Sequence, residues 1–426
     1  MAAPRILLIG TADTKSDELL YLRARVQAAG GEVVLMDVGV LEPAAFAPEI
    51  SNAEVAAAGG HTLAALREGG DENIAMQAMA AGAVVLALAA HRSGRIDGVL
   101  MLGGSMGTDL ALDVAAALPL GVPKVVLSTI AHSHLIAPER VSPDLTMMLW
   151  AGGLYGLNPV CKAILSQAAG AVVGACLAVE APSSPRPLIG MTSFGKSCLR
   201  YMVRLKPALE ARGFDVAVFH TTGMGGRAFE SMAAQGLFAA VFDFSLQEIS
   251  NHLGGSCVSA GPDRLSGAGR SATPQIVAPG AIDMIDFPAW APPPAGFEDR
   301  PSHAHNRLIA SATLDASQRA EVAAHIAQRL AQAQGPCVLM LPLHGLHAWD
   351  RSGEPLHDPQ ALAAFMAAMP AAAQAQGVAL QAVDAHINDD AFVDAALAQF
   401  DAWLAGGQVK GQVKGQVSAQ ANGRGA

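Results

Sequence analysis

The residues best suited to chemistry lie in short polar turns, and the first of these reads Gly10-Thr11-Ala12-Asp13-Thr14-Lys15. Hydroxyls and free backbone N–H groups could bind a phosphate there, with Lys15 supplying positive charge and Asp13 offering a ligand to Mg²⁺. The simpler interpretation makes Asp13 or Thr14 the N-cap of a helix. Capping explains one residue but not the whole set, so we predict that Thr11, Asp13, Thr14 and Lys15 bind a phosphorylated ligand.

A second turn, Gly103-Gly104-Ser105-Met106-Gly107-Thr108, is rich in glycine. Its glycines would let a ligand approach the backbone, and the helix that follows would direct its positive end at that ligand. The alternative is a tight turn that needs glycine only for its geometry. Because two such turns follow adjacent strands, we predict that both serve one nucleotide site. The candidate residues here are Gly103, Gly104, Ser105, Gly107 and Thr108.

A third turn, Gly190-Met191-Thr192-Ser193-Phe194-Gly195-Lys196-Ser197, matches the P-loop pattern G-x-x-x-x-G-K-[ST] between a predicted strand and a predicted helix. Two features count against a working P-loop. Phe194 is bulky for a loop that must wrap around phosphate, and only Asp243 offers a Walker-B-like partner. This turn therefore stays an alternative phosphate site.

Histidines gather in the second half of the chain, beside a segment that reads HTTGMGGR over 220–227. Arg227 could hold a carboxylate or phosphate with two hydrogen bonds, and His220, His305 and His386 could transfer a proton near neutral pH. A structural hydrogen-bond network would explain the same residues. His303 and His305 are spaced for metal ligation, but no HExxH or Cys/His spacing supports zinc, and the metal ligands stay unassigned.

The elements that must position these turns follow a βαβ pattern. Residues 5–9 form an apolar strand, 15–29 a helix and 32–38 the next strand. A helix over 71–90, a strand over 96–102, a helix from Asp109 and a strand over 123–128 continue it. Such units imply a parallel sheet with right-handed crossovers. We expect 43–70 to be a flexible insertion and 254–274 a long loop.

A linker rich in proline and serine over 181–187 divides the chain into two domains. After it the pattern restarts, with strands over 188–192, 214–219 and 238–243. We therefore predict an α/β fold with two Rossmann-like parallel-sheet domains, 1–180 and 188–405. A low-complexity tail over 406–426 is expected to be disordered.

The composition argues against several classes of protein. Of the 426 residues, 51% are apolar and 15% are charged, which indicates a large buried core. The net charge of −10, without a basic stripe, argues against nucleic acid as a partner. The N-terminus lacks the features of a signal peptide, and the longest apolar stretch, 78–90, is too short to span a bilayer. Five widely spaced cysteines fit a reducing compartment, so we predict a cytoplasmic protein without a membrane partner.

Six segments, taken in order, resemble a known family. They read IGTADTK (9–15), LGGSMGT (102–108), PKVVLST (123–129), FHTTGMGGRAFE (219–230), GAIDM (280–284) and HIND (386–389). The chain looks like the uncharacterised bacterial and plant family typified by the tomato mosaic virus resistance protein. Members of that family are described as carrying a tobamovirus-resistance-type ATP-binding domain, and the resemblance spans residues 5–404.

The resemblance implies two Rossmann-like domains and a tendency to form dimers. It also implies that ATP and Mg²⁺ bind the first domain through 11–15 and 103–108, and that Lys196 is not required. The plant protein's antiviral role is not transferred to this chain. We therefore predict an ATP-binding homodimer whose catalytic activity is unproven.

Two alternatives stay open. One is a hydrolase or lyase acting on a small organic acid in an interdomain cleft, with His220, Arg227, His305 and His386 as the catalytic residues. The other is a non-catalytic dimer that nucleotide stabilises and that binds a protein partner.

Overall fold

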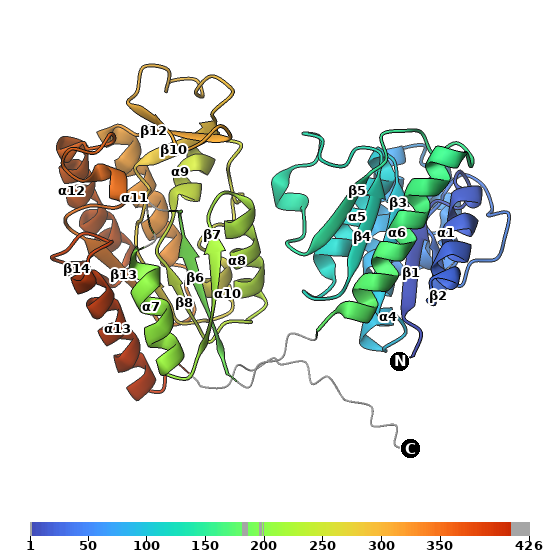
Figure 1. The fold of residues 1–426 in the computed structure, drawn as a ribbon, viewed down its shortest axis with the longest axis horizontal. Helices are drawn as coiled ribbons and strands as arrows, with labels where there is room; N and C mark the ends of the chain where they lie inside the picture. Colours follow the sequence, from blue (N-terminus) through green and yellow to red (C-terminus); the bar gives the residue numbers. More distant parts are fainter. Residues whose placement is uncertain (1, 181–185, 196–197, 199, 410–426) are drawn as a thin grey trace. The chain divides into compact units, whose positions relative to one another are not determined.

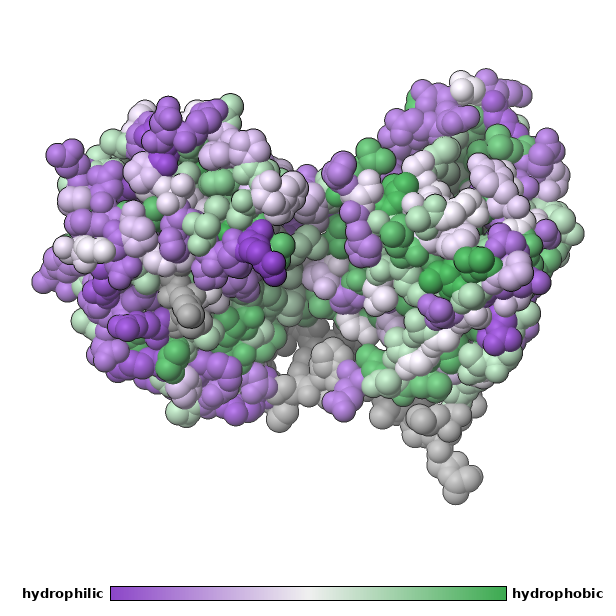
Figure 2. Space-filling view, turned by 45° about the horizontal axis from the view of Figure 1, so that its top comes forward, coloured by the Kyte–Doolittle hydropathy of each residue, from purple (hydrophilic) through white to green (hydrophobic). Residues whose placement is uncertain are grey.

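A computed structural model describes residues 2–180, 186–195, 198 and 200–409. The chain forms two compact units, Met1–Ser183 and Ser184–Ala426, and each is described by itself (Figure 1). Residues 181–185 of the predicted linker, Lys196 and Ser197 of the P-loop-like turn, and 410–426 of the predicted tail lie outside the described residues. On the face shown in Figure 2, hydrophilic and apolar residues are interspersed over both units.

The N-terminal unit is built on five parallel strands in the order β2-β1-β3-β4-β5. They are β1 (Arg5–Gly10), β2 (Glu32–Asp37), β3 (Gly98–Gly103), β4 (Lys124–Ser128) and β5 (Leu145–Leu149). Ile6 and Leu8 of β1 pack into the core on one face of the sheet, whereas Leu7 and Ile9 pack into the core on the other. Successive side chains of a strand point to opposite faces, so a strand buried on both sides is apolar throughout.

Helices cover both faces of this sheet (Figure 1). Helices α1 (Ser16–Ala28) and α6 (Pro159–Ala178) pack on one face, and α4 (Glu72–Arg92) and α5 (Ser105–Ala117) pack on the other. The connection from β1 through α1 to β2 therefore runs over one face, and that from β3 through α5 to β4 runs over the opposite face. The chain directions diverge between the neighbouring strands β1 and β3.

The segment 43–70, expected to be a flexible insertion, instead contains the helices α2 (Asn52–Ala58) and α3 (Leu63–Glu68). Helix α2 begins with a capping box, in which Ser51 and Glu54 each accept a hydrogen bond from the other's backbone N–H. It packs closely on α4, because a Cβ atom added to Gly82 would collide with the carbonyl group of Val55. The expectation was wrong because these short helices owe their stability to close packing rather than to a long apolar pattern.

The C-terminal unit contains a sheet of six parallel strands in the order β14-β13-β9-β8-β6-β7. These are β6 (Leu188–Ser193), β7 (Asp215–His220), β8 (Ala240–Asp243), β9 (Gln275–Val277), β13 (Cys337–Pro342) and β14 (Leu380–Val383). A separate antiparallel sheet has the order β10-β12-β11. Its strands are β10 (Met284–Pro288), β11 (Ser302–Ala304) and β12 (Ile309–Thr313).

Helices again cover both faces of the larger sheet. One face carries α7 (Arg200–Ala211) and α13 (Asp390–Ala405). The other carries α8 (Met224–Ala234), α9 (Gln247–Leu253), α11 (Ala316–Leu330) and α12 (Pro359–Gln376). The predicted long loop over 254–274 includes one more short helix, α10 (Gly267–Arg270).

The two units share one topology. In order of appearance along the chain, each parallel sheet places its second strand at the edge, its first strand next and its third strand beyond, a 2-1-3-4-5 arrangement to which the C-terminal sheet adds a sixth strand, β14. The prediction of an α/β fold with two Rossmann-like parallel sheets is confirmed. This doubly wound arrangement places ligands at the carboxyl ends of the strands, between the first and third strands of the unit.

Two helices, α4 and α6, are long and apolar enough to cross a membrane by length and composition alone. The stretch 78–90 was judged too short to span a bilayer, but it lies within the 21 residues of α4. Both helices have a buried face that packs on the sheet of the N-terminal unit. Core helices of an α/β fold share this character, so these two are weak evidence for a membrane protein.

Candidate functional site

The two predicted phosphate turns of the N-terminal unit leave the sheet side by side. One follows β1 and the other follows β3, and these strands are directly paired, with Ile9 opposite Met101. Since α1 and α5 then turn to opposite faces, both turns lie at the topological switch point of the sheet. This is where open parallel sheets bind their ligands.

The turn after β1 is held by contacts among its own residues. The Lys15 N–H donates to the Thr11 carbonyl at 3.0 Å, and the Thr11 and Thr14 hydroxyls lie 2.9 Å apart. The Lys15 ammonium donates to the Thr14 hydroxyl at 3.4 Å. Lys15 is the N-cap residue of α1, but its side chain caps nothing. The alternative interpretation, in which Asp13 or Thr14 is the N-cap, is therefore wrong, and two hydroxyls and one ammonium lie together in front of the helix.

Asp13 of this turn and Asp37 at the end of β2 connect the turn to the segment that follows β2. Asp37 is buried at the end of β2 and accepts the N–H groups of Ala12 at 2.9 Å and Gly39 at 2.8 Å. Burial raises the pKa of Asp37, and the nearby charge of Asp13 adds to this effect. Asp13 accepts the Leu41 N–H at 2.9 Å through Oδ2, while its buried Oδ1 has no hydrogen-bond partner among the described residues.

The residues of the turn after β3 have different roles. A Cβ atom added to Gly103 would collide with Gly107, so close packing of strand on helix requires these glycines. Thr108 is fully buried and its hydroxyl lies 2.7 Å from that of Ser128. Gly104 differs, because an added Cβ would meet only the Thr129 hydroxyl, at 3.8 Å. Gly104 and the exposed Ser105 are thus the members of this turn that a ligand could reach.

Both helices at the switch point begin with unsatisfied donors. Within the described part of the chain, no acceptor is present for the N–H groups of Ser105, Met106 and Gly107, the first three residues of α5. The same is true of the first three N–H groups of α1. Such groups carry the partial positive charge of the helix dipole and favour an anion.

The switch point of the C-terminal unit is closed by the protein's own side chains. After β8, the N–H groups of Phe244 and Ser245 donate to the Thr192 hydroxyl at 3.0 and 3.1 Å. That hydroxyl donates in turn to Asp243 at 2.7 Å. After β6, the N–H of Phe194 donates to the Cys198 carbonyl at 3.4 Å and that of Gly195 to His220 Nδ1 at 3.2 Å.

These contacts bear on the P-loop-like turn, where Lys196 and Ser197 lie outside the described residues. A P-loop binds phosphate through free backbone N–H groups. At Phe194 and Gly195 those groups already have acceptors within the protein.

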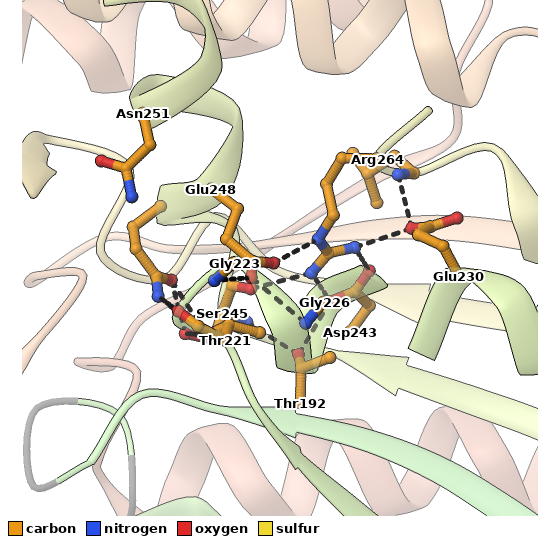
Figure 3. Close-up of polar contacts among 12 residues, drawn as sticks. Thr192, Thr221, Gly223, Gly226, Glu230, Asp243, Ser245, Glu248, Asn251 and Arg264 are labelled. Carbon is orange, nitrogen blue, oxygen red and sulfur yellow. Dashed lines mark hydrogen bonds and ion pairs between the residues drawn. The ribbon is translucent and has the colours of Figure 1, made fainter. Parts of the chain in front are cut away.

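A buried guanidinium lies at the centre of a group of carboxylates behind the glycine-rich turn of 220–227 (Figure 3). Arg264 contacts Asp243 at 2.7 Å, Glu248 at 2.9 Å and Glu230 at 3.0 Å, and all four side chains are at most 5% exposed. Three carboxylates thus surround one cation. Burial raises the pKa of Glu248 to about 7, although Arg264 acts to lower it.

Glu248 also accepts hydrogen bonds at the N-terminal end of α8. Its Oε1 accepts the N–H groups of Gly223 at 2.6 Å and Gly226 at 3.1 Å, at the beginning of α8. A Cβ atom on Gly226 would collide with this carboxylate, and one on Gly225 would collide with the His220 carbonyl. The glycines of this turn therefore serve internal packing.

The structure separates the four predicted catalytic residues. His220 and His305 line one pocket of about 320 Å³, together with Phe194, Gly195, Thr222, Val258, Pro288, Asn306, Leu308, Ile309 and Trp349. Arg227 is half-buried on α8 and is not among the lining residues, and it has no ion pair within the described ranges.

His386 is buried at 1% exposure and also lies outside the lining set. Its Nε2 is 3.0 Å from both Asp350 Oδ1 and the His347 carbonyl, while Nδ1 accepts the Asn388 N–H at 3.0 Å. Every polar atom of this imidazole therefore has a partner inside the protein, which is typical of a structural histidine.

A compact group of possible metal ligands, Asp283, His347 and Asp350, lies next to His386. Arg319 approaches Asp283 at 3.3 Å, and His347 Nε2 approaches it at 3.1 Å. Burial acts to raise the pKa of Asp283, but His347 and Arg319 together hold it below its usual value. Because a cationic guanidinium already compensates this carboxylate, we assign the group to internal ion pairing.

Sequence reasoning missed the residues whose partners are distant in the chain. Arg264 lies in the predicted loop of 254–274, and Trp349 lies in a short 3-10 helix (Ala348–Asp350). The sequence does carry one signal for the buried acidic residues, because Asp37 and Asp243 each stand at the end of an apolar strand.

Two doubly wound parallel sheets, one with an open polar switch point, define a two-domain α/β protein of Rossmann-like architecture. The chain belongs to the uncharacterised protein family UPF0261. The N-terminal domain of that family matches residues 4–181, and its C-terminal domain matches residues 186–404.

Relatives match along nearly the whole chain. A UPF0261 protein of Brucella melitensis biotype 1 is 55% identical over 407 residues, which cover 96% of this chain and 97% of that protein. The ToMV resistance protein Tm-1 of Solanum lycopersicum is 27% identical over 93% of this chain, but the match covers only 55% of that plant protein. The predicted family is thus confirmed in part, since the chain belongs to UPF0261 and the plant protein is a more distant relative than the bacterial one.

Similarity to solved structures is weak. A putative UDP-N-acetylglucosamine 2-epimerase from Listeria monocytogenes aligns over 65% of this chain and 79% of that protein, with 10% identity and a TM-score of 0.22. A likeness at this level carries no argument about ligand or activity.

Proposed function

We propose that the N-terminal unit binds ATP at its switch point, with the triphosphate between the turns after β1 and β3. The observation that carries this proposal is the pair of helices, α1 and α5, whose first N–H groups have no acceptor among the described residues. Two helix N-termini at adjacent strand ends favour a ligand with several negative charges.

The side chains of the two turns add specific interactions. The Lys15 ammonium is the cation of the first turn, and the Thr11 and Thr14 hydroxyls lie beside it. Gly104 leaves the backbone accessible on the opposite side. Asp13 Oδ1, which has no partner in the described structure, would hold Mg²⁺ directly or through a water molecule. Gly103 and Thr108 position the turn without touching the ligand, and Gly107 contributes its backbone N–H.

The remaining parts of the proposal rest on the family resemblance and the composition. They are that the protein is cytoplasmic, that it forms a homodimer and that Mg²⁺ binds together with ATP. The name of the plant relative records resistance to a virus, which we do not extend to this chain. Whether ATP is cleaved is a separate question, answered by measuring phosphate release from the purified protein with Mg²⁺.

Calorimetry of ATP and Mg²⁺ binding to a Gly104→Val variant tests the site. The free protein has room for the new side chain, so we expect a folded variant whose affinity for ATP falls about tenfold or more. Gly174→Val is the matched control, because Gly174 is exposed on α6 with open space around its Cβ position. It should bind ATP as the wild type does.

Two further variants separate this site from the P-loop-like turn. Lys15→Ala should weaken ATP binding because it removes the cation of the first turn, and Lys196→Ala should change it little. Unchanged ATP affinity in a folded Gly104→Val protein would refute the proposal. So would a large loss in Lys196→Ala with none in Lys15→Ala.

A further inference from the structure

The pocket of about 320 Å³ that His220 and His305 line in the C-terminal unit has no role in the proposed ATP binding. It lies at the carboxyl ends of β6 and of its neighbour, the edge strand β7, where Gly195 follows β6 and His220 ends β7. The antiparallel sheet supplies another wall, through Pro288 and the turn between β11 and β12. Its volume of about 320 Å³ is within the range of small-molecule sites.

Four aromatic rings contribute to the walls of this pocket. Phe194 stacks on His220 with ring centroids 6.1 Å apart and 17° between the planes, and it meets Trp349 edge-on at 6.4 Å. Trp349 also contacts His303 at 4.8 Å and His305 at 5.7 Å. Flat π systems arranged in this way bind other flat rings by stacking and by edge-to-face contact.

Several polar groups of the same lining have no hydrogen-bond partner among the described residues. The side chains of Thr222 and His305 make no hydrogen bond in the described structure, and Asn306 uses only its Oδ1, which leaves its amide nitrogen free. His220 Nδ1 accepts the Gly195 N–H, so its Nε2 carries the proton in the neutral ring. The pocket thus offers hydroxyl, amide and imidazole groups to a ligand that can both donate and accept.

Gly195 keeps this space open. Its φ of +47° is in the left-handed region, and an added Cβ would lie 3.6 Å from His220 Cε1 and 3.9 Å from His305 Nε2. Both imidazoles therefore face the same point above the Gly195 Cα. Partial burial lowers the pKa of His220, and the nearby His305 lowers it further, which favours the neutral ring at neutral pH.

From this combination we propose that the pocket binds a planar heteroaromatic ring that carries hydrogen-bonding groups on its edge. The ring stacks against Trp349 and Phe194 while Thr222, His305 and Asn306 bind its edge. This class includes neutral nucleosides and heteroaromatic acids. The site is separate from the proposed ATP site, since every described lining residue belongs to the C-terminal unit.

The test is a calorimetric titration of the full-length protein with three probes, namely adenosine, nicotinate and citrate. It uses the Gly104→Val background so that the N-terminal turns do not contribute. We expect adenosine or nicotinate to bind and citrate, which has no ring, not to bind. Binding by adenosine alone assigns a neutral nucleoside, and binding by nicotinate alone assigns a heteroaromatic acid. ATP is titrated in parallel into the wild-type protein, which has Gly104. Loss of the proposed ring binding and loss of the proposed ATP binding are then recognised separately.

Two variants locate the ring. Trp349→Leu removes the stacking surface and should weaken ring binding about tenfold or more. Thr222→Val keeps the shape and removes one hydroxyl, which gives a second test should Trp349→Leu fold poorly. Trp290→Leu is the matched control, because Trp290 is 76% exposed and outside the lining set. The proposal is overturned if neither ring probe binds, if citrate binds as well as they do, or if Thr222→Val and Trp349→Leu bind as Trp290→Leu does.

Discussion

The switch points of the two units have the same topology but opposite contents. In the N-terminal unit, the first N–H groups of α1 and α5 have no acceptor in the described structure. In the C-terminal unit, the N–H groups of Phe244 and Ser245, which directly follow β8, bind Thr192, and Arg264 with its carboxylates occupies the space behind them. A Rossmann-like sheet therefore provides the position of a ligand site, and the local side chains decide whether that position stays open.

Two glycines illustrate the difference at the level of single atoms. Gly104 has open space around its Cβ position, whereas a Cβ on Gly226 would collide with the buried Glu248 carboxylate. Both lie in glycine-rich segments at the beginning of a helix, Gly104 as the N-cap of α5 and Gly226 in the first turn of α8. Only the first is free to serve a ligand, because in the second the Glu248 carboxyl group already accepts backbone N–H groups at the helix N-terminus.

The largest effect is expected from removing the cation that closes the C-terminal switch point. Arg264→Leu leaves Asp243, Glu230 and Glu248 buried without their shared partner, so the C-terminal unit should lose about 3–5 kcal/mol of stability. Arg227→Leu is the matched control and should cost little, because Arg227 has no ion pair among the described residues. Denaturant unfolding measures both. Equal losses in the two variants would show that Arg264 does not hold the crevice closed.

A smaller effect concerns pH and the same crevice. The folded-state pKa of Glu248 is raised from 4.5 to about 7, so the folded protein keeps a proton that the unfolded chain releases. Its contribution to stability is complete below pH 4.5 and is lost as the pH rises through 7. At about 1.4 kcal/mol per pKa unit, the loss could reach about 3 kcal/mol.

Glu248→Gln tests this pH dependence. We compare the free energies of unfolding of wild type and variant at pH 5 and pH 8. Other groups such as His347 titrate in both proteins, so their effect cancels in the comparison. The wild type should lose more stability than the variant over this interval, because only the wild type has the Glu248 carboxyl group. An equally steep fall in the variant would mean that Glu248 is ionised throughout.

The fold was largely accessible from sequence because buried parallel strands are short, wholly apolar and separated by helices. The strand predicted over 5–9 appears as β1 (Arg5–Gly10), and that over 214–219 appears as β7 (Asp215–His220). Helix α5 begins at Ser105 rather than near Asp109. The helices α2 and α3 and the antiparallel sheet were missed, because their short segments are stabilised by tertiary packing that no local pattern records.

The candidate sites were accessible only in part. Sequence reasoning found the turns, since glycine and hydroxyl residues after an apolar strand are a local signal. It could not tell an open turn from a closed one, because the partners that close it are distant. Glu248 is 25 residues from Gly223, and Thr192 is 52 residues from Phe244. Sequence reasoning also assigned His386 and His305 to one catalytic group, because the partners that bury His386 inside the protein are distant in sequence.

The smallest predicted effect separates those two histidines. His386→Ala would leave the buried Asp350 Oδ1 without its hydrogen-bond partner, at a cost of about 1–3 kcal/mol. In a unit of this size that lowers the melting temperature by several degrees, at about 2–4 °C per kcal/mol. His305→Ala removes an exposed ring with no hydrogen bond in the described structure, so it should melt with the wild type and lose affinity only for the ring probes. Thermal denaturation of the two variants side by side decides the matter. If His305→Ala melts as early as His386→Ala, the pocket histidines belong to the scaffold, and the contrast between an internal network and an open pocket fails.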